Sequence, residues 1–328
     1  MKEKLSVIVP VYNKEGYLER SLTTLRNQTY QDIEVIIVDD GSTDKSKEVC
    51  MKFCAEDNRF KYYYKNNGGV ASARNFGLDK ASGGYIGFVD PDDYIEIDMY
   101  EKMLNTAIER NADIVGCGIR MLLSNEIKKI TESRDYELTS KNAAIHLLKW
   151  DNMVTPYLWN KIFRKSILKE IRFNEKLKVG EDFPFVFECI LHASGYIHIC
   201  NFLYTYVRNA DSLVGIKYKC ESSKNSIYSS IYVCELSNIK YHEFADICKY
   251  SLLLNCYFQM SMILHEKVCN DMLWKDLIFF QRFSLKIDKK IIKNYGGVVL
   301  YLKAVLCFKY PQLYSCLLYT SPSPRDKR

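Results

Sequence analysis

Short apolar runs alternate with helical patterns along the first third of the chain. Five of these runs have the length and the β-branched or aromatic content of buried strands: 5–11, 34–40, 60–65, 85–90 and 112–118. Between them, apolar residues recur at helical spacing, as Leu18, Leu22 and Leu25 do. Strands that alternate with helices in this way predict an α/β fold with a mainly parallel, Rossmann-like sheet and helices on both faces.

The alternation weakens after residue 118. The polar segment 121–138 predicts a hairpin or an irregular stretch, and the pattern is helical and rich in apolar residues from about residue 219. We therefore expect an α/β domain over 1–215 and a helical C-terminal region over 216–320. Residues 321–328, SPSPRDKR, show no apolar periodicity and resemble vector sequence, so we expect a non-native or disordered tail.

Polar residues follow the ends of the predicted strands. Tyr12 follows the first strand, Asp39 and Asp40 end the second, and an acidic group over 90–93 follows the fourth. Ligands bind at the carboxyl ends of the strands in such sheets. One Asp could cap the next helix, but three carboxylates within four positions favour a divalent cation, because hard cations prefer oxygen ligands.

Composition limits the classes of function. Of the 328 residues, 48% are hydrophobic and 26% charged, as in ordinary globular proteins. The net charge of +6 is too small to favour nucleic-acid binding. The 12 cysteines lack the spacing of metal or redox motifs and predict reduced thiols. The first apolar run is too short for a signal peptide, so we expect a cytoplasmic protein.

Four segments together resemble one family. VIVPVYN, QTYQDIEVIIVDDGSTD, NNGGVASARNFGLDKASGGYIGFVDPDDY and GED occur in the order and approximate spacing of the bacterial family 2 glycosyltransferases, over about residues 4–210. The resemblance implies a GT-A fold. It also implies inverting transfer of a sugar from a nucleotide diphosphate to an acceptor hydroxyl, without a covalent enzyme intermediate.

The resemblance also implies a donor site. Substrate-binding residues are expected at positions Pro10, Tyr12, Asp40, Asn67, Gly69, Arg74 and Asp90. Asp40 would accept a hydrogen bond from the nucleotide base, and Arg74 would reach the nucleotide or its diphosphate. A helix cap and a solvated arginine are the structural alternatives for these two residues.

The resemblance implies different roles for the three aspartates over 90–93. Asp90 and Asp92 match the D-x-D motif of the family, in which the first carboxylate meets the ribose or metal and the second ligates Mn²⁺ or Mg²⁺. The cation would stabilise the diphosphate leaving group as a Lewis acid. Asp93 is expected to cap the helix that follows, and a position in the outer coordination shell of the metal is the alternative.

Two further positions bear on the acceptor. Asp182 matches the catalytic base of the family, with Glu181 as the rival, and its structural alternative is the N-cap of the following helix. Trp159 resembles the aromatic residue that many relatives place near the sugar and acceptor, although it could equally belong to the core.

These residues favour a non-processive enzyme that builds a bacterial surface polysaccharide or glycolipid. The expected partners are a nucleotide-sugar donor, with UDP favoured, and a saccharide or lipid-linked saccharide acceptor. The oligomeric state stays open. A nucleotidyltransferase acting on sugar phosphates and a non-catalytic sugar-nucleotide-binding protein are the alternatives.

A basic, apolar-rich segment over 282–309 suggests peripheral contact with the inner face of the cell membrane. Val298, Val299, Leu302, Val305 and Leu306 recur in it at helical spacing. Packing of this stripe inside the protein is the alternative. The longest uncharged stretch, 250–264, is too short to span a membrane, so no spanning helix is expected.

Overall fold

The computed structural model describes residues 3–123, 126–208, 220–265, 271–285, 287–311 and 314. The chain divides into two compact units, Met1–Ala210 and Asp211–Arg328. Each unit buries its own apolar side chains. The boundary expected at residue 215 and the tail expected at 321–328 both lie outside the described residues.

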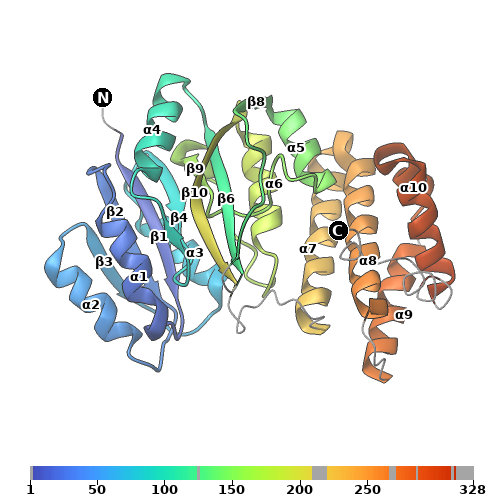
Figure 1. Cartoon of the computed structure of the whole chain (residues 1–328), viewed down its shortest axis with the longest axis horizontal. Helices are drawn as coiled ribbons and strands as arrows, with labels where there is room; N and C mark the ends of the chain where they lie inside the picture. The colour runs from blue at the N-terminus through green and yellow to red at the C-terminus, as the bar shows by residue number, and fades with distance from the viewer. Residues whose placement is uncertain are drawn as a thin grey trace. The chain divides into compact units, whose positions relative to one another are not determined.

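The first unit is an α/β structure, as predicted (Figure 1). Its strands are β1 (Leu5–Val11), β2 (Ile33–Asp39), β3 (Phe60–Tyr64), β4 (Tyr85–Phe88), β5 (Tyr94–Ile95), β6 (Ile114–Leu123), β7 (Glu126–Lys129), β8 (Tyr136–Thr139), β9 (Lys161–Arg164) and β10 (Gly195–Arg208). Its helices are α1 (Glu15–Arg26), α2 (Ser46–Glu56), α3 (Val70–Lys80), α4 (Met99–Glu109), α5 (Ser140–Lys149) and α6 (Asp182–His192), with a short 3₁₀ helix at Lys165–Leu168.

All described strands join one sheet, in the order β3-β2-β1-β4-β9-β6-β10-β5, with β7 on β6 and β8 on β10. The pairs β1–β2, β2–β3, β1–β4 and β6–β10 are parallel. However, β9 lies antiparallel between β4 and β6, and β7 forms a hairpin with β6, so the sheet is mixed. The parallel strands β1 to β4 are those whose carboxyl ends carry the polar motifs, and the strand order reverses beside β1.

Alternation along β1 sets the two faces of the sheet. Val7 belongs to a core cluster that also contains Leu22 of α1 and Met103 of α4. Its neighbour Ile8 points to the opposite face, toward α3. There a Cβ on Gly77 would lie only 2.5 Å from Ile8 Cγ2, so glycine allows α3 to pack directly on the strand.

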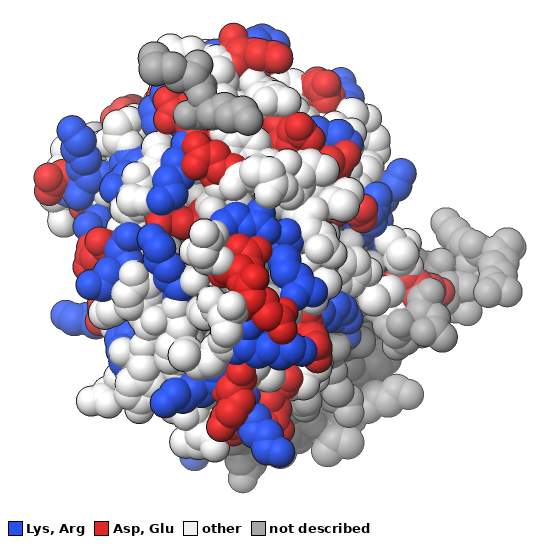
Figure 2. All heavy atoms as spheres, turned by 90° about the vertical axis from the view of Figure 1, so that its left-hand side faces the viewer, with Lys and Arg blue, Asp and Glu red and all other residues white. Residues whose placement is uncertain are grey.

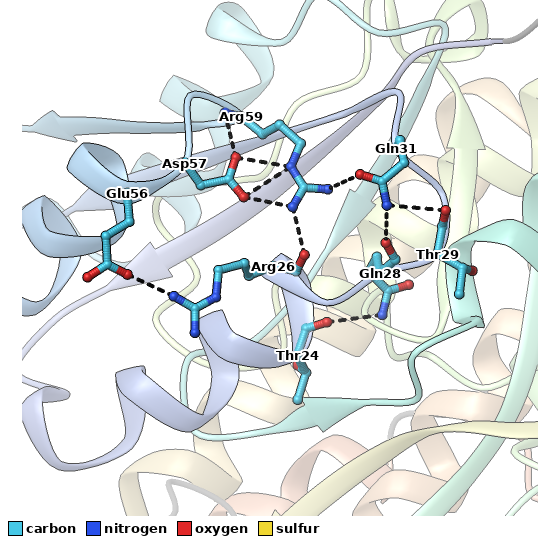
Figure 3. A network of polar contacts seen from close by, with 8 residues as sticks. All are labelled: Thr24, Arg26, Gln28, Thr29, Gln31, Glu56, Asp57 and Arg59. Carbon is cyan, nitrogen blue, oxygen red and sulfur yellow. Dashed lines mark hydrogen bonds and ion pairs between the residues drawn. The ribbon is translucent and has the colours of Figure 1, made fainter.

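A polar network joins the end of α1 to the start of β3 (Figure 3). The guanidinium of Arg59 donates to both carboxylate oxygens of Asp57, to the carbonyl of Arg26 at 2.6 Å and to Gln31 Oε1 at 3.2 Å. Arg26 in turn pairs with Glu56 of α2 at 2.8 Å. These bonds fix the amino-terminal side of β2 and β3, away from the ends that carry the motifs.

The face of the molecule in Figure 2 carries basic and acidic side chains interspersed. Exposed pairs such as Lys52 with Glu19, at 3.2 Å, join side chains of opposite charge. Such a face presents no field of a single sign that would attract a polyanion.

The second unit is helical in its described part. It contains α7 (Cys220–Lys240), a 3₁₀ turn at His242–Phe244, α8 (Ala245–His265), α9 (Asp271–Leu285) and α10 (Lys290–Lys309). Asn255 of α8 donates to the carbonyl and hydroxyl of Ser226 and to the hydroxyl of Ser230, which ties α8 to α7.

Helix α10 bears on the expectation that the chain has no membrane-spanning helix. Among the described residues it is the one helix long and apolar enough, by length and composition, to cross a membrane. Only 22% of its apolar window is buried. The helix is not continuous, because Gly297 has a φ of +79° and kinks it.

Candidate active site

A single arginine joins three carboxylates at the carboxyl ends of the strands. Arg74 lies on α3 with its side chain 4% exposed. One guanidinium nitrogen, Nη1, donates to Glu181 at 2.5 Å and to Asp182 at 2.7 Å, and Nη2 donates to Asp90 at 3.0 Å. The sequence motifs on α3, after β4 and at the start of α6 thus meet at one side chain. The alternative of a solvated arginine is wrong.

The charge in this cluster is unbalanced, because one guanidinium faces three carboxylates. Burial raises the pKa of Asp182 and of Asp90, and Arg74 only partly offsets that effect. Burial would lower the pKa of Arg74, but its three carboxylate partners raise it above the ordinary value. The Nε–H of Arg74 is buried and has no partner among the described residues. Because three carboxylates face one guanidinium, the cluster can take further cationic charge.

Asp182 is not a helix cap. Helix α6 begins at Asp182 itself, and its N-cap residue is Glu181, whose side chain makes no capping hydrogen bond. The structure therefore contradicts the alternative that Asp182 is the N-cap of this helix. Both carboxylates instead bind Arg74. The side chain of Asp182 is 20% exposed and that of Glu181 is 8% exposed, so Asp182 is the more accessible of the two.

Asp92 has a different cationic partner. Its carboxylate pairs with Lys14 Nζ at 2.7 Å, and its carbonyl accepts a hydrogen bond from Arg20 at 2.6 Å. The Asp92 side chain is 20% exposed. Asp90 and Asp92 therefore stand on one short loop, and each carboxylate is held by a basic side chain, Asp90 by the buried Arg74 and Asp92 by the half-buried Lys14.

Asp93 does not cap the following helix, which corrects the expectation for this residue. The N-cap of α4 is Asp98. Asp93 is fully buried, and its carboxylate accepts from the Tyr204 hydroxyl and the Val207 amide, both at 2.8 Å. The same Tyr204 hydroxyl accepts from the Asp90 amide at 3.2 Å. These bonds to β10 fix the backbone of the loop that carries Asp90 and Asp92.

The expected base-binding carboxylate is held by a neighbouring loop. Asp40 Oδ1 accepts from Lys65 Nζ at 2.6 Å and from the Gly68 amide at 3.0 Å, and Oδ2 accepts from the Gly69 amide at 2.7 Å. Asn67 donates its side-chain amide to the Asp40 carbonyl at 2.9 Å. Asp40 therefore does not cap α2, whose N-cap residue is Lys45.

Gly41, next to Asp40, allows the loops to meet, because its φ is +82° and a Cβ would lie 2.9 Å from the Asn67 amide nitrogen. Pro10 is buried at the end of β1, and Tyr12 stands 50% exposed just beyond it. Tyr12 is therefore free to contact a bound molecule, and Pro10 shapes the backbone beneath it.

Trp159 is buried, with 4% of its area exposed. Its ring stacks on those of Tyr204, Tyr157 and Tyr206, with centroids 4.2, 4.8 and 5.9 Å away. This position supports the core alternative for Trp159, because a sugar could reach the ring only after a tyrosine moved. The sequence analysis did not single out Lys14, Tyr204 or Tyr157, although Lys14 directly follows the VIVPVYN segment and Tyr157 lies two residues before Trp159.

The acidic residues fit a divalent cation only together with the phosphates of a bound nucleotide-sugar donor. Among the described residues, no three His, Cys, Asp or Glu side chains are arranged to hold a metal ion. Mg²⁺, however, is commonly held by one or two carboxylates together with substrate phosphates and waters. Asp90 and Asp92 offer two such carboxylates, beside a cluster with excess negative charge.

Comparison with known proteins gives the same family by two routes. The family described as "Glycosyl transferase family 2" matches residues 6–172. EpsJ of Bacillus subtilis, described as an uncharacterized glycosyltransferase, is 30% identical over 272 residues, which are 79% of this chain and 77% of EpsJ. The minor teichoic acid biosynthesis protein GgaB of the same organism is 30% identical over 83% of this chain, which spans 29% of that longer protein.

A solved structure shows the same fold. The crystal structure of Staphylococcus aureus TarS 1–349 in complex with UDP-GlcNAc superposes with a TM-score of 0.69 at 21% identity, over 94% of this chain and 92% of that one. Asp182 lies beyond the family match at 6–172, so its role depends on the geometry around Arg74.

Proposed function

The chain belongs to the family 2 glycosyl transferases, and from this premise we propose that it transfers a sugar from a UDP-sugar to an acceptor hydroxyl with inversion, aided by Mn²⁺ or Mg²⁺. The observation that carries the proposal is the contact of Arg74 with both Asp90 and Asp182. It joins a carboxylate of the D-x-D loop and the candidate base through the two terminal nitrogens of one guanidinium.

Asp182 is the proposed general base. It would accept the proton of the acceptor hydroxyl while the acceptor oxygen bonds to the anomeric carbon and the bond from that carbon to the diphosphate breaks. Attack from the face opposite the leaving group inverts the configuration. The raised pKa of Asp182 makes its carboxylate a stronger base, and its exposed fifth lets an acceptor reach it.

The donor would occupy the ends of β1, β2 and β4. Asp40 uses three of about four acceptor positions on its carboxylate, which leaves one on Oδ2 for a uracil N–H. Asn67 and Gly69 would position that carboxylate, with Tyr12 against the base and Pro10 beneath it. The UDP-GlcNAc bound by TarS supports uridine as the nucleotide.

Asp90 and Asp92 are the residues that would hold the cation. When bound, it supplies Lewis-acid stabilisation of the charge that develops on the leaving diphosphate. Arg74 keeps Asp90 oriented in the free protein, and Lys14 does the same for Asp92.

The product is proposed to be a bacterial surface polymer, because GgaB acts in teichoic acid biosynthesis. Membership in the family removes the nucleotidyltransferase alternative. The presence of Asp90, Asp92 and the candidate base Asp182 argues against a protein that only binds sugar nucleotides.

Calorimetry with UDP tests the donor and metal sites together. We expect UDP to bind more tightly with Mn²⁺ than without metal, and D92N to weaken the Mn²⁺-dependent binding at least about tenfold, since loss of even an outer partner of a metal ligand costs that much. D98N, in the same acidic stretch but outside the site, is the control. Equal Mn²⁺-dependent affinity in D92N and the wild type would remove Asp92 from the metal site.

The acceptor is proposed to be lipid-linked, which would place the enzyme at the cytoplasmic face of the membrane. Helix α10 presents an exposed apolar stripe formed by Val298, Val299 and Leu302, which are 53%, 69% and 59% exposed. Lys293 and Lys303 are exposed on the same helix. Such a helix suits the interface of an anionic membrane, where each lysine contributes about 1 kcal/mol.

Vesicle flotation tests this contact. We expect the protein to float with phosphatidylglycerol vesicles at low salt and to be released at high salt, and V299E to float less. I239S, which changes an exposed apolar residue of α7, is the matched control. A protein that stays unbound at low salt would contradict peripheral contact, and so would binding that resists high salt.

A further inference from the structure

Tyr157 is the exposed aromatic residue beside the candidate base. We propose that its ring is the platform on which the acceptor saccharide stacks, with the reacting hydroxyl directed to Asp182. This inference rests on the proposed function and deepens it, because it names the acceptor subsite and a pyranose ring as its ligand. Trp159, two residues later, was the sequence candidate for this task.

Exposure separates the two aromatic residues. Tyr157 is 37% exposed, whereas Trp159 is 4% exposed and Tyr204 is fully buried. The Tyr157 and Trp159 rings are nearly parallel, with an interplanar angle of 9° and centroids 4.8 Å apart. Trp159 stacks in turn on Tyr204. Tyr157 is therefore the solvent-exposed end of a three-ring stack whose buried end holds the Asp90 amide and the Asp93 carboxylate.

The Asp182 carboxylate and Arg208 both act electrostatically on the Tyr157 phenol. Burial of its hydroxyl raises the pKa of Tyr157, the Asp182 carboxylate raises it further, and Arg208 works against both effects. Asp182 and Arg208 therefore both lie within electrostatic reach of the phenol.

A buried lysine fixes the backbone beneath the platform. Lys161 is fully buried, and its ammonium donates to the Tyr157 carbonyl at 2.6 Å, to the Thr155 carbonyl at 2.9 Å and to Asn160 Oδ1 at 2.8 Å. The segment that carries Tyr157 is thus ordered before any ligand arrives. Preorganisation lowers the entropic cost of binding, and tyrosine combines an apolar face with a polar tip, as a sugar ring requires.

Saturation-transfer NMR tests the platform with defined probes. The probes are the methyl glycosides of glucose, galactose, N-acetylglucosamine and rhamnose, added to full-length protein with UDP and Mn²⁺. We expect saturation of the ring protons of at least one glycoside in the wild type. Y157A should weaken its binding by about tenfold, since aromatic contacts of this kind and the apolar area they bury approach 1.4 kcal/mol. Y157F should keep most of the binding.

Y228A, which removes a tyrosine of similar exposure from α7, is the matched control and should bind the glycoside as the wild type does. Circular dichroism and UDP calorimetry on each variant show whether the fold and the donor site persist. If no glycoside receives saturation in the wild type, or if Y157A binds as the wild type does, the platform is wrong. Loss of UDP binding by the wild type itself would instead contradict the proposed function.

Discussion

Two carboxylate sites at opposite ends of the sheet are built in opposite ways. At the amino-terminal ends, the single carboxylate of Glu34 accepts from Lys4, Lys61, the Ser6 hydroxyl and both the amide and hydroxyl of Ser82. These hydrogen bonds outweigh the cost of burial and hold the pKa of Glu34 well below its usual range.

At the carboxyl ends the ratio is reversed, because the three carboxylates share the one guanidinium of Arg74. Burial dominates there and raises the pKa of Asp90 and Asp182. The first site is satisfied and therefore stabilises the fold. The second keeps a deficit of positive charge, which suits a site that a cation and a proton must enter.

The largest expected effect is on the chemistry at the second site. D182N keeps the side-chain volume but removes the proton acceptor, so transfer should fall by about 10²–10⁴-fold, the usual share of general acid–base catalysis. Initial rates of UDP release from UDP-sugar measure this loss, and UDP affinity should persist. E181Q, the matched change at the less exposed neighbour, should cost much less. The reverse ranking would make Glu181 the base.

A smaller effect should separate the two sites by stability. E34Q removes the charge that five donors share, and unfolding in urea should show a loss of about 1.5–3 kcal/mol, the value of hydrogen bonds to a charged group. Lys4 and Lys61 are both more than one-third exposed and can return to water, which limits the loss. D90N relieves repulsion in the overcharged cluster and should be at least as stable as the wild type. A large loss of stability in D90N would contradict the proposed difference between the two carboxylate sites.

The smallest effect concerns acid. Because the folded-state pKa of Glu34 is lowered, its contribution to stability is present above the unfolded value of about 4.3 and is lost as the pH falls through the folded value. The free energy of unfolding should therefore fall less steeply below about pH 4 in E34Q than in the wild type. If the free energy of unfolding falls with the same slope below about pH 4 in both proteins, Glu34 is not selectively stabilised as a carboxylate.

The sequence by itself determined the strands and helices of the α/β unit and the strand ends at which the candidate site lies. An apolar run such as 34–40 is stable as a buried strand of a sheet that is covered on both faces. Polar residues directly after such a strand must lie at the carboxyl edge of the sheet. The motifs around Asp40, Asp90 and Arg74 therefore indicated the family and the donor side before any contact was known.

Only the tertiary structure decided which side chains meet. Arg74 and Asp182 are 108 positions apart, and Asp93 and Tyr204 are 111 apart, so no local pattern could reveal either bond. Locally, Asp93 and Asp182 both looked like helix caps, because an aspartate before a helix normally finds its donors in the first turn. Here buried partners on other elements bind these carboxylates instead. Burial, which depends on the packing of the whole sheet, likewise placed Trp159 inside and left Tyr157 exposed.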